Sequence, residues 1–358
     1  MSNEWAEMLK NLGIEPDASE LPEVEEAQNG SDGSVQLHDL SDWRVVDVTG
    51  ADAASFLQGQ FCNDLLQVSV TRAQITGYCT PKGRLLALPV IVGTEDGFRL
   101  LIKSAVMGAF IKRLSMFIMR SDVTLSERTE LICSGVVADS AQSVGDLQGA
   151  LGTLPFAPLD VATSESSQLI RWHDDHVGQT RSRFVHIANQ ADSVAMWNST
   201  GSERKSFARW RAGDISAGIP SITEGTSESF VPQMINLQLI DALSFTKGCY
   251  PGQEIVARMQ YLGKLKRHMR LFKLPGGDAP LVPGAKLSAG DDAAAGEVID
   301  AVTINESGAG EESRYTLLIA VVKVSSDASA LSIEGRELQA LDVPYNLPSL
   351  SDSSDEST

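Results

Sequence analysis

The spacing of apolar residues between positions 35 and 123 predicts a first set of regular elements. WRVVDVTG indicates a strand that ends at Gly50, GADAASFLQGQFCNDL a helix, and QITGYCTPKGRLLALPVIVG a hairpin around Thr80-Pro81-Lys82-Gly83. FRLLIK indicates a further strand, and SAVMGAFIKRLSMFIM a helix with apolar residues at helical spacing. This β-α-β-β-α order predicts an α+β layer, with helices packed on one face of an antiparallel sheet.

After about position 123 the pattern restarts. ELICSGVVA, QLIRWHDD and RFVHIA are typical of strands, SVGDLQGALG of a helix, and SERKSFARWRAGDISAG of a helix that runs to Gly218. A second α+β unit is therefore expected between about 129 and 220. From Leu271 onward, short apolar runs alternate with Gly, Pro, Asp and Ser turns, which indicates a small antiparallel barrel or sandwich.

The predicted fold class is α+β, with two α+β modules and a C-terminal antiparallel β-barrel. The expected boundaries are 1–33 for an acidic, partly disordered N-terminal segment, 34–128 for the first module, 129–262 for the second, 263–345 for the barrel and 346–358 for an acidic tail. Within the first segment, Trp5, Met8, Leu9 and Leu12 have helical spacing, which predicts a short helix over 2–12.

Composition narrows the class of protein. The 358 residues are 42% hydrophobic and 21% charged, as in globular proteins. There is no apolar run of about 18 residues and no secretory leader at the start, so we expect a cytoplasmic protein with no membrane span. The four cysteines and five histidines show neither a disulfide framework nor metal-ligand spacing, so no metal site is expected.

The negative charge lies mostly at the two ends. Residues 1–33 carry nine acids against one base, and the last eight residues add three more acids. The body therefore accounts for only −7 of the formal net charge of −18. This acidity disfavours a general nucleic-acid coat protein but leaves room for a local basic patch.

Cys249 has the most unusual surroundings in the chain, in the stretch SFTKGCYPGQEIVARMQYLGKLKRHMR (244–270). Ile255, Met259 and Leu262 predict a helix that begins just after Tyr250-Pro251-Gly252, which would put Cys249 before a helix N-terminus that favours an anion. Lys247 adds a cation nearby, and Gly248 and Gly252 allow unusual backbone angles. The residue types alone leave two interpretations open: a reactive thiolate or a small buried core cysteine. Cys62, Cys79 and Cys133 lie within apolar patterns and are expected in the core.

A basic run follows the cysteine. Arg258, Lys264, Lys266, Arg267, His268, Arg270 and Lys273 occur with no acid between Val256 and Lys273. This run is either a solvated connection or a site for an anion such as phosphate, an RNA backbone or a polyglutamate tail.

KGCYPGQE, residues 247–254, resembles the motif K-G-C-[YF]-x-G-Q-[EH] of the YgfZ family, folate-binding proteins related to the T-protein (aminomethyltransferase) of the glycine cleavage system. LSDWRVVDVTGADAASFLQGQFCNDL, YCTPKGRLLA and ARWRAGDISAGIP match in the same order, so the resemblance covers about 35–345.

The resemblance implies a ring of three domains, with tetrahydrofolate or a one-carbon-substituted form bound at its centre by the first module. It implies folate contacts at Trp43 and Trp210, a functional role for Cys249, and supporting roles for the motif residues Lys247, Gly248, Tyr250, Gly252, Gln253, Glu254 and Arg258. The implied role is support of iron–sulfur enzymes and of tRNA modification, with tRNA or iron–sulfur proteins as partners of a monomer.

Two positions depart from the family's pattern. Ser216 replaces an acid before Gly-Ile-Pro, and Thr80 replaces an acid in the hairpin. The T-proteins use an acid in that hairpin region, so its absence disfavours aminomethyl transfer. Three hypotheses stay open: a folate-dependent factor with a reactive Cys249, a folate-dependent one-carbon transferase acting on a small amine, and a non-enzymatic folate-sensing scaffold for iron–sulfur assembly.

Overall fold

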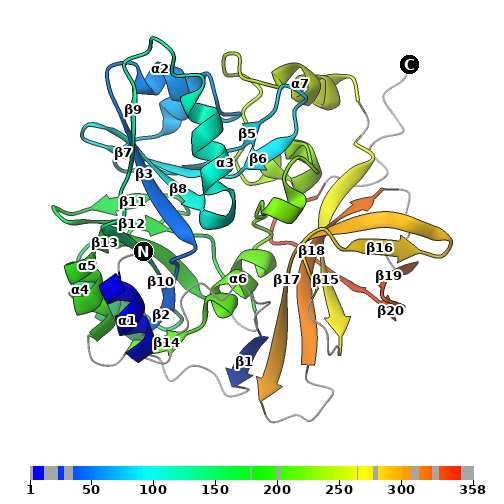
Figure 1. The fold of residues 1–358 in the computed structure, drawn as a ribbon. Coiled ribbons are helices and arrows are strands. Elements are labelled where there is room, and N and C mark those ends of the chain that lie inside the picture. The colour runs from blue at the N-terminus through cyan, green and yellow to red at the C-terminus, as the bar shows by residue number, and fades with distance from the viewer. Residues whose placement is uncertain are drawn as a thin grey trace.

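The computed structural model describes residues 3–11, 23–27, 35–177, 180–198, 202–263, 265–276, 281–307, 314–324 and 330–347. Figure 1 shows two sheet-and-helix modules beside a barrel of long strands, as the predicted fold class requires. Most of the expected acidic segments, and Lys264 of the basic run, lie outside the described residues.

The first module is built on a five-stranded antiparallel sheet. Its strand order is β4 (Gln74–Ile75), β7 (Val90–Thr94), β8 (Gly97–Lys103), β3 (Trp43–Thr49) and β9 (Thr124–Glu127). Helices α2 (Ala53–Gln58) and α3 (Ser104–Ser115) accompany it, and α3 buries Val106, Phe110 and Leu114 as its spacing predicts. The predicted hairpin is confirmed: β5 (Tyr78–Cys79) pairs with β6 (Leu85–Ala87) across the turn at 80–83.

The second module has a six-stranded sheet. The order is β11 (Val161–Thr163), β12 (Ser167–Arg171), β13 (Ser182–Asn189), β10 (Leu131–Ala138), β2 (Val35–Asp39) and β14 (Ser202–Lys205). Helices α4 (Ala141–Leu151) and α5 (Gln190–Asn198) belong to this module. Strand β2 precedes the first module in the chain but pairs with β10, so the chain crosses between the two sheets at its start.

The helix predicted from Ser202 to Gly218 is wrong in its first part. Residues Ser202–Lys205 form β14, which pairs in parallel with β2, and helix α6 (Phe207–Ser216) begins only after Ser206. The Ser206 side chain caps α6 by accepting a hydrogen bond from the Arg209 amide. Pairing with a distant strand therefore overrides the local pattern.

Strand β10 explains how the two sheets stack. Ile132 and Val136 face the core under α1 (Asn3–Asn11), α4 and α5, whereas Cys133 and Val137 face the core shared with the first module. Because successive side chains point to opposite faces of a sheet, a strand buried on both faces must be apolar throughout. The continuous apolar run in ELICSGVVA is the sequence signature of this position.

Helix α1 confirms the helix predicted near the N-terminus. Trp5 and Leu9 are fully buried against the outer face of the six-stranded sheet. The Trp5 ring meets Trp197 edge to face at 5.6 Å between centroids, and its Nε1 donates to Asp39 Oδ1 at 3.3 Å. The N-terminal helix is therefore part of the second module's core.

The C-terminal lobe is a nearly closed sheet with its own core. Its main strand order is β20 (Arg336–Glu337), β19 (Leu331–Ile333), β16 (Lys286–Ala289), β17 (Asp292–Ser307), β18 (Arg314–Lys323), β15 (Arg267–Pro275) and β21 (Gln339–Leu341), all antiparallel. Strand β1 (Glu23–Ala27) adds in parallel to β17 and ties the N-terminal segment to the barrel. Bulges in β17 and β16 bend the sheet, as closure requires.

The long link between α6 and the barrel holds short helical turns and one helix. The turns are η2 (Glu224–Thr226), η3 (Pro232–Ile235) and η4 (Leu237–Leu239), and the helix is α7 (Gln253–Tyr261); a further turn, η1 (Leu65–Gln67), follows α2. None of the helices in the described ranges is both long and apolar enough to cross a membrane.

We predict that Asp39 makes the stability of the second module depend on pH. Burial raises the pKa of Asp39 from 3.8 to about 6. The unfolded chain therefore loses this proton first as the pH rises, and the free energy of unfolding falls by roughly 3 kcal/mol between about pH 4 and pH 6. Urea unfolding across this range should show wild type losing stability relative to Asp39→Asn, while parallel curves for the two proteins would contradict the assignment.

Candidate functional site

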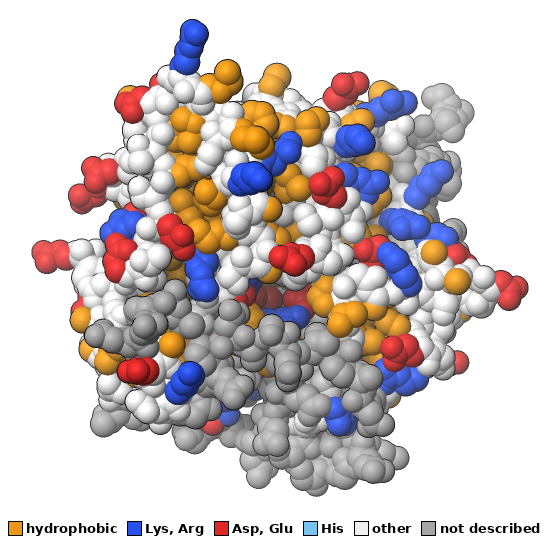
Figure 2. Space-filling model, viewed as in Figure 1, with side chains coloured by type: hydrophobic (Ala, Val, Ile, Leu, Met, Phe, Trp, Pro, Cys, Tyr) orange, Lys and Arg blue, Asp and Glu red, His pale blue; other side chains and the backbone are white. Residues whose placement is uncertain are grey.

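A cavity of about 300 Å³ lies where the two modules and the barrel meet. The first module contributes Asp42, Trp43 and Lys103, the second Trp172, Phe207, Arg211 and Asp214, and the barrel Asp300. In Figure 2 the face that carries α3 and α6 is hollowed near its centre, and acidic and basic atoms lie within the recess. This size, with apolar walls and a few polar groups, is typical of a small-molecule site.

A partly buried ion pair lies at the first module's side of the cavity. Lys103 Nζ lies 2.7 Å from Asp42 Oδ2, 4.4 Å from the centre of the Trp43 ring and 5.1 Å from that of Phe207. Burial raises the pKa of Asp42, although Lys103 opposes this shift. Asp42 Oδ1 and Trp43 Nε1 are both buried and have no hydrogen-bond partner among the described residues. Two residues of the cavity wall thus hold one acceptor and one donor without a partner among the described residues, although neither atom has accessible surface of its own.

A second ion pair closes the cavity on the barrel side. Arg211 of α6 contacts the Asp300 carboxylate of β17, and the Ala301 amide donates to the same carboxylate oxygen at 2.8 Å. Asp300 is almost completely buried. This contact connects helix α6 directly to the barrel.

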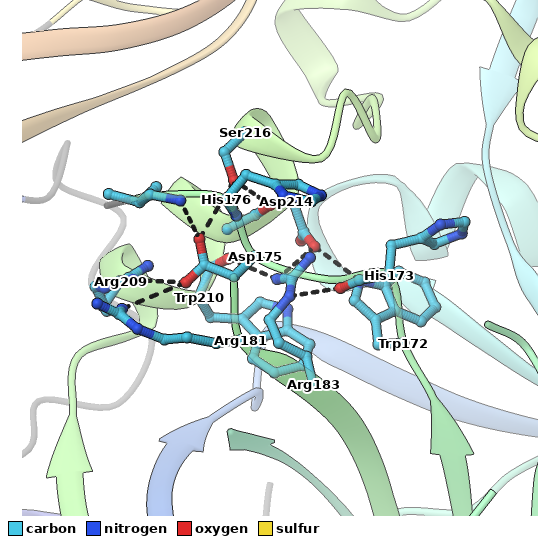
Figure 3. Close-up of polar contacts among 12 residues, drawn as sticks. Trp172, His173, Asp175, His176, Arg181, Arg183, Arg209, Trp210, Asp214 and Ser216 are labelled. Atoms are coloured by element: carbon cyan, nitrogen blue, oxygen red, sulfur yellow. Dashed lines mark hydrogen bonds and ion pairs between the residues drawn. The ribbon is translucent and has the colours of Figure 1, made fainter. Parts of the chain in front are cut away.

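Asp214 on α6 completes the polar lining. Its Oδ1 accepts a hydrogen bond from Trp172 Nε1 at 2.8 Å and forms an ion pair with Arg183 Nη1 at 2.9 Å (Figure 3). Arg183 is fully buried, and its Nε donates to the His173 carbonyl at 2.8 Å. Trp172 meets the Trp43 ring edge to face at 5.6 Å between centroids. The arginine therefore fixes both the carboxylate and the indole that line the cavity.

Asp175 holds helix α6 through contacts with Arg209 and Ser216. Its carboxylate pairs with Arg209 Nη2 at 2.5 Å and lies 3.5 Å from Arg181 Nη1, and Ser216 Oγ donates to it at 3.3 Å (Figure 3). Ser216 Oγ also accepts from the His176 amide at 3.0 Å. Ser216, which replaces an acid of the family's pattern, thus ties the end of α6 to the loop after β12.

The two tryptophans predicted to contact folate occupy different environments. Trp43 lines the cavity. Trp210 is 1% exposed, and its ring packs on the Arg183 guanidinium at 4.6 Å and on the His38 ring at 5.8 Å. A Cβ on Gly135 would approach the Trp210 ring to 2.5 Å, so the indole is enclosed by the sheet. Phe207, Arg211 and Asp214 of the same helix line the cavity, and Trp210 does not.

Cys62, Cys79 and Cys133 are buried, as the sequence predicts. Cys249, for which the residue types left two interpretations open, is exposed. Burial raises the pKa of Cys133 to about 12, which keeps that thiol protonated. Helix α7 begins at Gln253, so Cys249 precedes a helix N-terminus, as expected. No residue of the KGCYPGQE motif lines the cavity beside Trp43.

Lys247 holds the motif to the first module. Its Nζ donates to the carbonyls of Gln58, Phe61 and Asn63 at 2.5, 2.6 and 3.0 Å, and it is 7% exposed. The Lys247 ammonium therefore binds carbonyl groups at the end of α2 and just after it, whereas Cys249 is exposed. Tyr250 is also buried, with its ring 5.4 Å from Lys247 Nζ. These two side chains fix the loop on either side of the cysteine.

Gly252 joins the motif to the hairpin of the first module. It has a φ of +86°, and an added Cβ would lie 2.5 Å from the Thr80 carbonyl oxygen and 2.6 Å from Gly83 Cα. Gly248 does not have a positive φ, and a Cβ there would meet nothing within 4 Å, so the expectation of unusual backbone angles is right for Gly252 and wrong for Gly248. Thr80 closes the hairpin turn, with its Oγ1 accepting from the Arg84 amide at 3.2 Å.

The remaining motif residues lie on α7. Gln253 starts the helix, its amide donating to the Tyr250 carbonyl at 3.2 Å, and Glu254 and Arg258 are exposed. Within the described ranges, no three His, Cys, Asp or Glu side chains converge on a point that could hold a metal ion.

Sequence reasoning missed four residues of the cavity: Asp42, Lys103, Arg211 and Asp300. Asp42 and Arg211 each adjoin a tryptophan that the sequence did single out, in SDWRVV and ARWRAG. Charged residues next to those aromatic residues were the available signal. Nothing local marks Lys103 or Asp300, because their importance depends on tertiary contacts.

Gly252 and Gly248 form a matched pair for testing the loop. We predict that Gly252→Ala destabilises the protein, by about 1–3 kcal/mol from the backbone conformation alone, with the contact to Thr80 adding to this. Gly248→Ala should leave the unfolding midpoint within about 0.5 kcal/mol of wild type. Chemical denaturation of the two variants would contradict this description of the loop if it gave equal losses.

Comparisons of sequence and of structure relate this chain to known proteins. No protein-family model matches the chain. It is 34% identical over 240 residues to the tRNA-modifying protein YgfZ of Edwardsiella ictaluri, covering 66% of this chain and 70% of that protein. The protein of the same name from Colwellia psychrerythraea is 29% identical over 252 residues, which are 70% of this chain and 72% of that protein. The one from Sodalis glossinidius is 30% identical over 233 residues, which are 64% of this chain and 69% of that protein.

Among solved structures, the glycine cleavage system aminomethyltransferase T from Bartonella henselae has the same fold, with a TM-score of 0.64 over 87% of this chain and 86% of that one. At 14% identity this likeness concerns the fold alone. The sequence relatives decide the family: the chain belongs to the YgfZ family of tRNA-modifying proteins.

Proposed function

We propose that this protein binds tetrahydrofolate, or a one-carbon-substituted form of it, in the cavity and supports tRNA modification through the exposed thiol of Cys249. The observation that carries the folate assignment is that two residues of the cavity wall, Asp42 and Trp43, each hold a buried polar atom, Oδ1 and Nε1, with no partner among the described residues. Buried polar atoms without partners are rare in proteins, which supports a polar ligand at this position.

The residues present fit a reduced pterin. The ring carries N–H and amino donors and a carbonyl acceptor on one edge, and its flat faces are apolar. Asp42 would accept from the donor edge, Trp43 and Phe207 would pack on the ring, and Lys103 would stay beside Asp42 to balance its charge. Trp210 would act from the side of α6 that faces the sheet, by supporting Arg183 and through it Asp214.

Bound folate would supply a one-carbon unit at its N5 or N10 position. The chain's own residues orient it and exclude water: Trp43 and Trp172 form the inner wall, and the pairs Asp42–Lys103 and Arg211–Asp300 keep the charges on either side matched. A water-poor site with fixed dipoles strengthens each of these interactions.

Cys249 would act on a partner macromolecule. Its thiol is exposed and lies outside the cavity lining, and the loop that carries it is fixed by Lys247 and Gly252. A rigid loop with an exposed sulfur suits reaction with a group presented by another molecule. Support of iron–sulfur enzymes that modify tRNA is the form of this role that the family suggests.

We predict that Asp42→Asn weakens tetrahydrofolate binding by roughly 10–100-fold, because a hydrogen bond to a charged group contributes about 1.5–3 kcal/mol. Quenching of tryptophan fluorescence under anaerobic conditions measures the affinity. Asp96→Asn, at an exposed turn between β7 and β8, is the matched control and should bind as wild type does.

Cys249→Ala separates the two parts of the proposal. It should bind tetrahydrofolate normally and fail to restore tRNA methylthiolation in a strain that lacks the protein. Restoration by Cys249→Ala together with intact folate binding would favour a non-enzymatic folate-sensing scaffold. Normal folate binding by Asp42→Asn would remove the cavity assignment.

A further inference from the structure

The exposed surface of helix α7 and of the segments on either side of it forms a basic and apolar face next to Cys249. We call it the α7 face and define it by six exposed residues: Lys82, Ile255, Arg258, Tyr261, Leu262 and Lys266. Figure 2 shows Lys and Arg side chains gathered over α7 and the start of β15, with few acidic side chains among them.

The parts of this face are in contact with one another. The hairpin turn that carries Lys82 packs on the N-terminal end of α7, where a Cβ on Gly83 would lie 3.1 Å from Ile255 Cβ. Ile255, Arg258 and Leu262 follow at helical spacing along the outer side of α7. At the far end, Tyr261 meets Phe245 at 6.2 Å between ring centroids, and Phe245 lies four residues before Cys249.

No ion pair joins a cation of the α7 face to a carboxylate within the described residues, although exposed Glu254 lies one turn before Arg258. Lys82, Arg258 and Lys266 are exposed and form no ion pair with any residue that the structure describes. Glu254 is the one acid of KGCYPGQEIVARMQYL, and it lies in the first turn of α7, where it complements the helix dipole. In contrast, exposed Lys286 on the barrel is paired with Glu297.

We propose that the α7 face binds the phosphate backbone of an RNA and thereby brings that RNA, or the enzyme complex that holds it, to Cys249. The inference rests on the proposed function for its choice of polyanion. Three exposed cations without an ion pair among the described residues attract phosphates even though the chain's formal net charge is −18. Exposed Tyr261, 68% accessible, offers a face on which an unpaired base can stack.

An RNA suits this surface better than a protein does. Along α7, Arg258 lies between the exposed apolar residue Ile255 and the pair Tyr261 and Leu262, and Lys266 follows them. Interleaved aromatic and basic residues are typical of single-stranded nucleic-acid sites, where cations follow the backbone and aromatic rings stack. A protein partner is the alternative outcome of the test.

Fluorescence anisotropy with labelled, unmodified tRNA tests the proposal on the full-length protein. The double variant Arg258→Glu/Lys266→Glu should bind on the order of tenfold more weakly than wild type, and the slope of log affinity against log salt should fall by about two. Lys286→Glu changes the charge of another exposed lysine and should stay within about twofold of wild type. Tyr261→Ala should weaken binding with the salt slope unchanged.

Three other outcomes overturn the proposal. The first is an equal loss of tRNA affinity in the double variant and in Lys286→Glu, and the second is a double variant that binds tRNA as wild type does. The third is a wild-type protein that binds tetrahydrofolate but not tRNA. If the double variant binds tRNA normally but no longer supports tRNA modification, the face contacts a protein. Tetrahydrofolate binding is measured on the same samples. Normal binding by the double variant shows that this variant is folded. Absence of binding in the wild-type protein contradicts the cavity assignment and does not bear on the α7 face.

Discussion

Two ion pairs made by helix α6, from residues three positions apart, connect the second module to the barrel. Arg183 pairs with Asp214 and ties the helix to the sheet of the second module, while Arg211 pairs with Asp300 and ties it to the barrel. Both pairs are buried or nearly so, and removing one partner of such a pair costs about 3–5 kcal/mol because the other charge is left without compensation. The cavity exists because this helix is held between the two lobes.

The same arrangement separates the two chemical features of the molecule. Asp42, Trp43 and Lys103 face the cavity, whereas Cys249 lies on an outer loop that packs on the hairpin of the first module. Lys247, whose motif position suggested a cation for the thiolate, instead donates to three backbone carbonyls after α2. The motif is therefore a structural connection between modules that presents a sulfur, and folate and thiol need not meet.

Much of the architecture follows from local pattern. Helices α1 and α3 were predictable, because each shows the helical period and buries the face that the pattern marks. Helix α4 and strands β15 and β18 were also predictable from their apolar residues. Helix α7 was predictable as a helix, but Ile255 and Leu262, which mark its apolar face in the sequence, are exposed, and Val256 is buried instead. Strand β14 was not predictable, because the local pattern of SERKSFARW favours a helix and only pairing with the distant strand β2 makes Ser202–Lys205 a strand. The placement of β2 beside β10 was hidden for the same reason, because partner choice is a long-range property.

The residues of the candidate site also divide into those that the sequence reveals and those that only the tertiary structure reveals. Sequence marked Trp43 and Cys249, which the structure places in a cavity wall and on an exposed loop. It also marked Trp210, whose ring is enclosed between α6 and the sheet. It did not reveal Lys103, Arg211 or Asp300, because single charges become a site only when three lobes bring them together. The residues that sequence reveals best are those whose roles are local to one motif.

The central claim is that folate and the reactive thiol occupy separate sites on one rigid frame. The most direct test is the rate of Cys249 alkylation by iodoacetamide, followed by mass spectrometry, with and without saturating tetrahydrofolate. The account predicts that Cys249 reacts far faster than buried Cys133 and that folate leaves its rate unchanged. Strong protection of Cys249 by folate, or equal rates at Cys249 and Cys133, would contradict it.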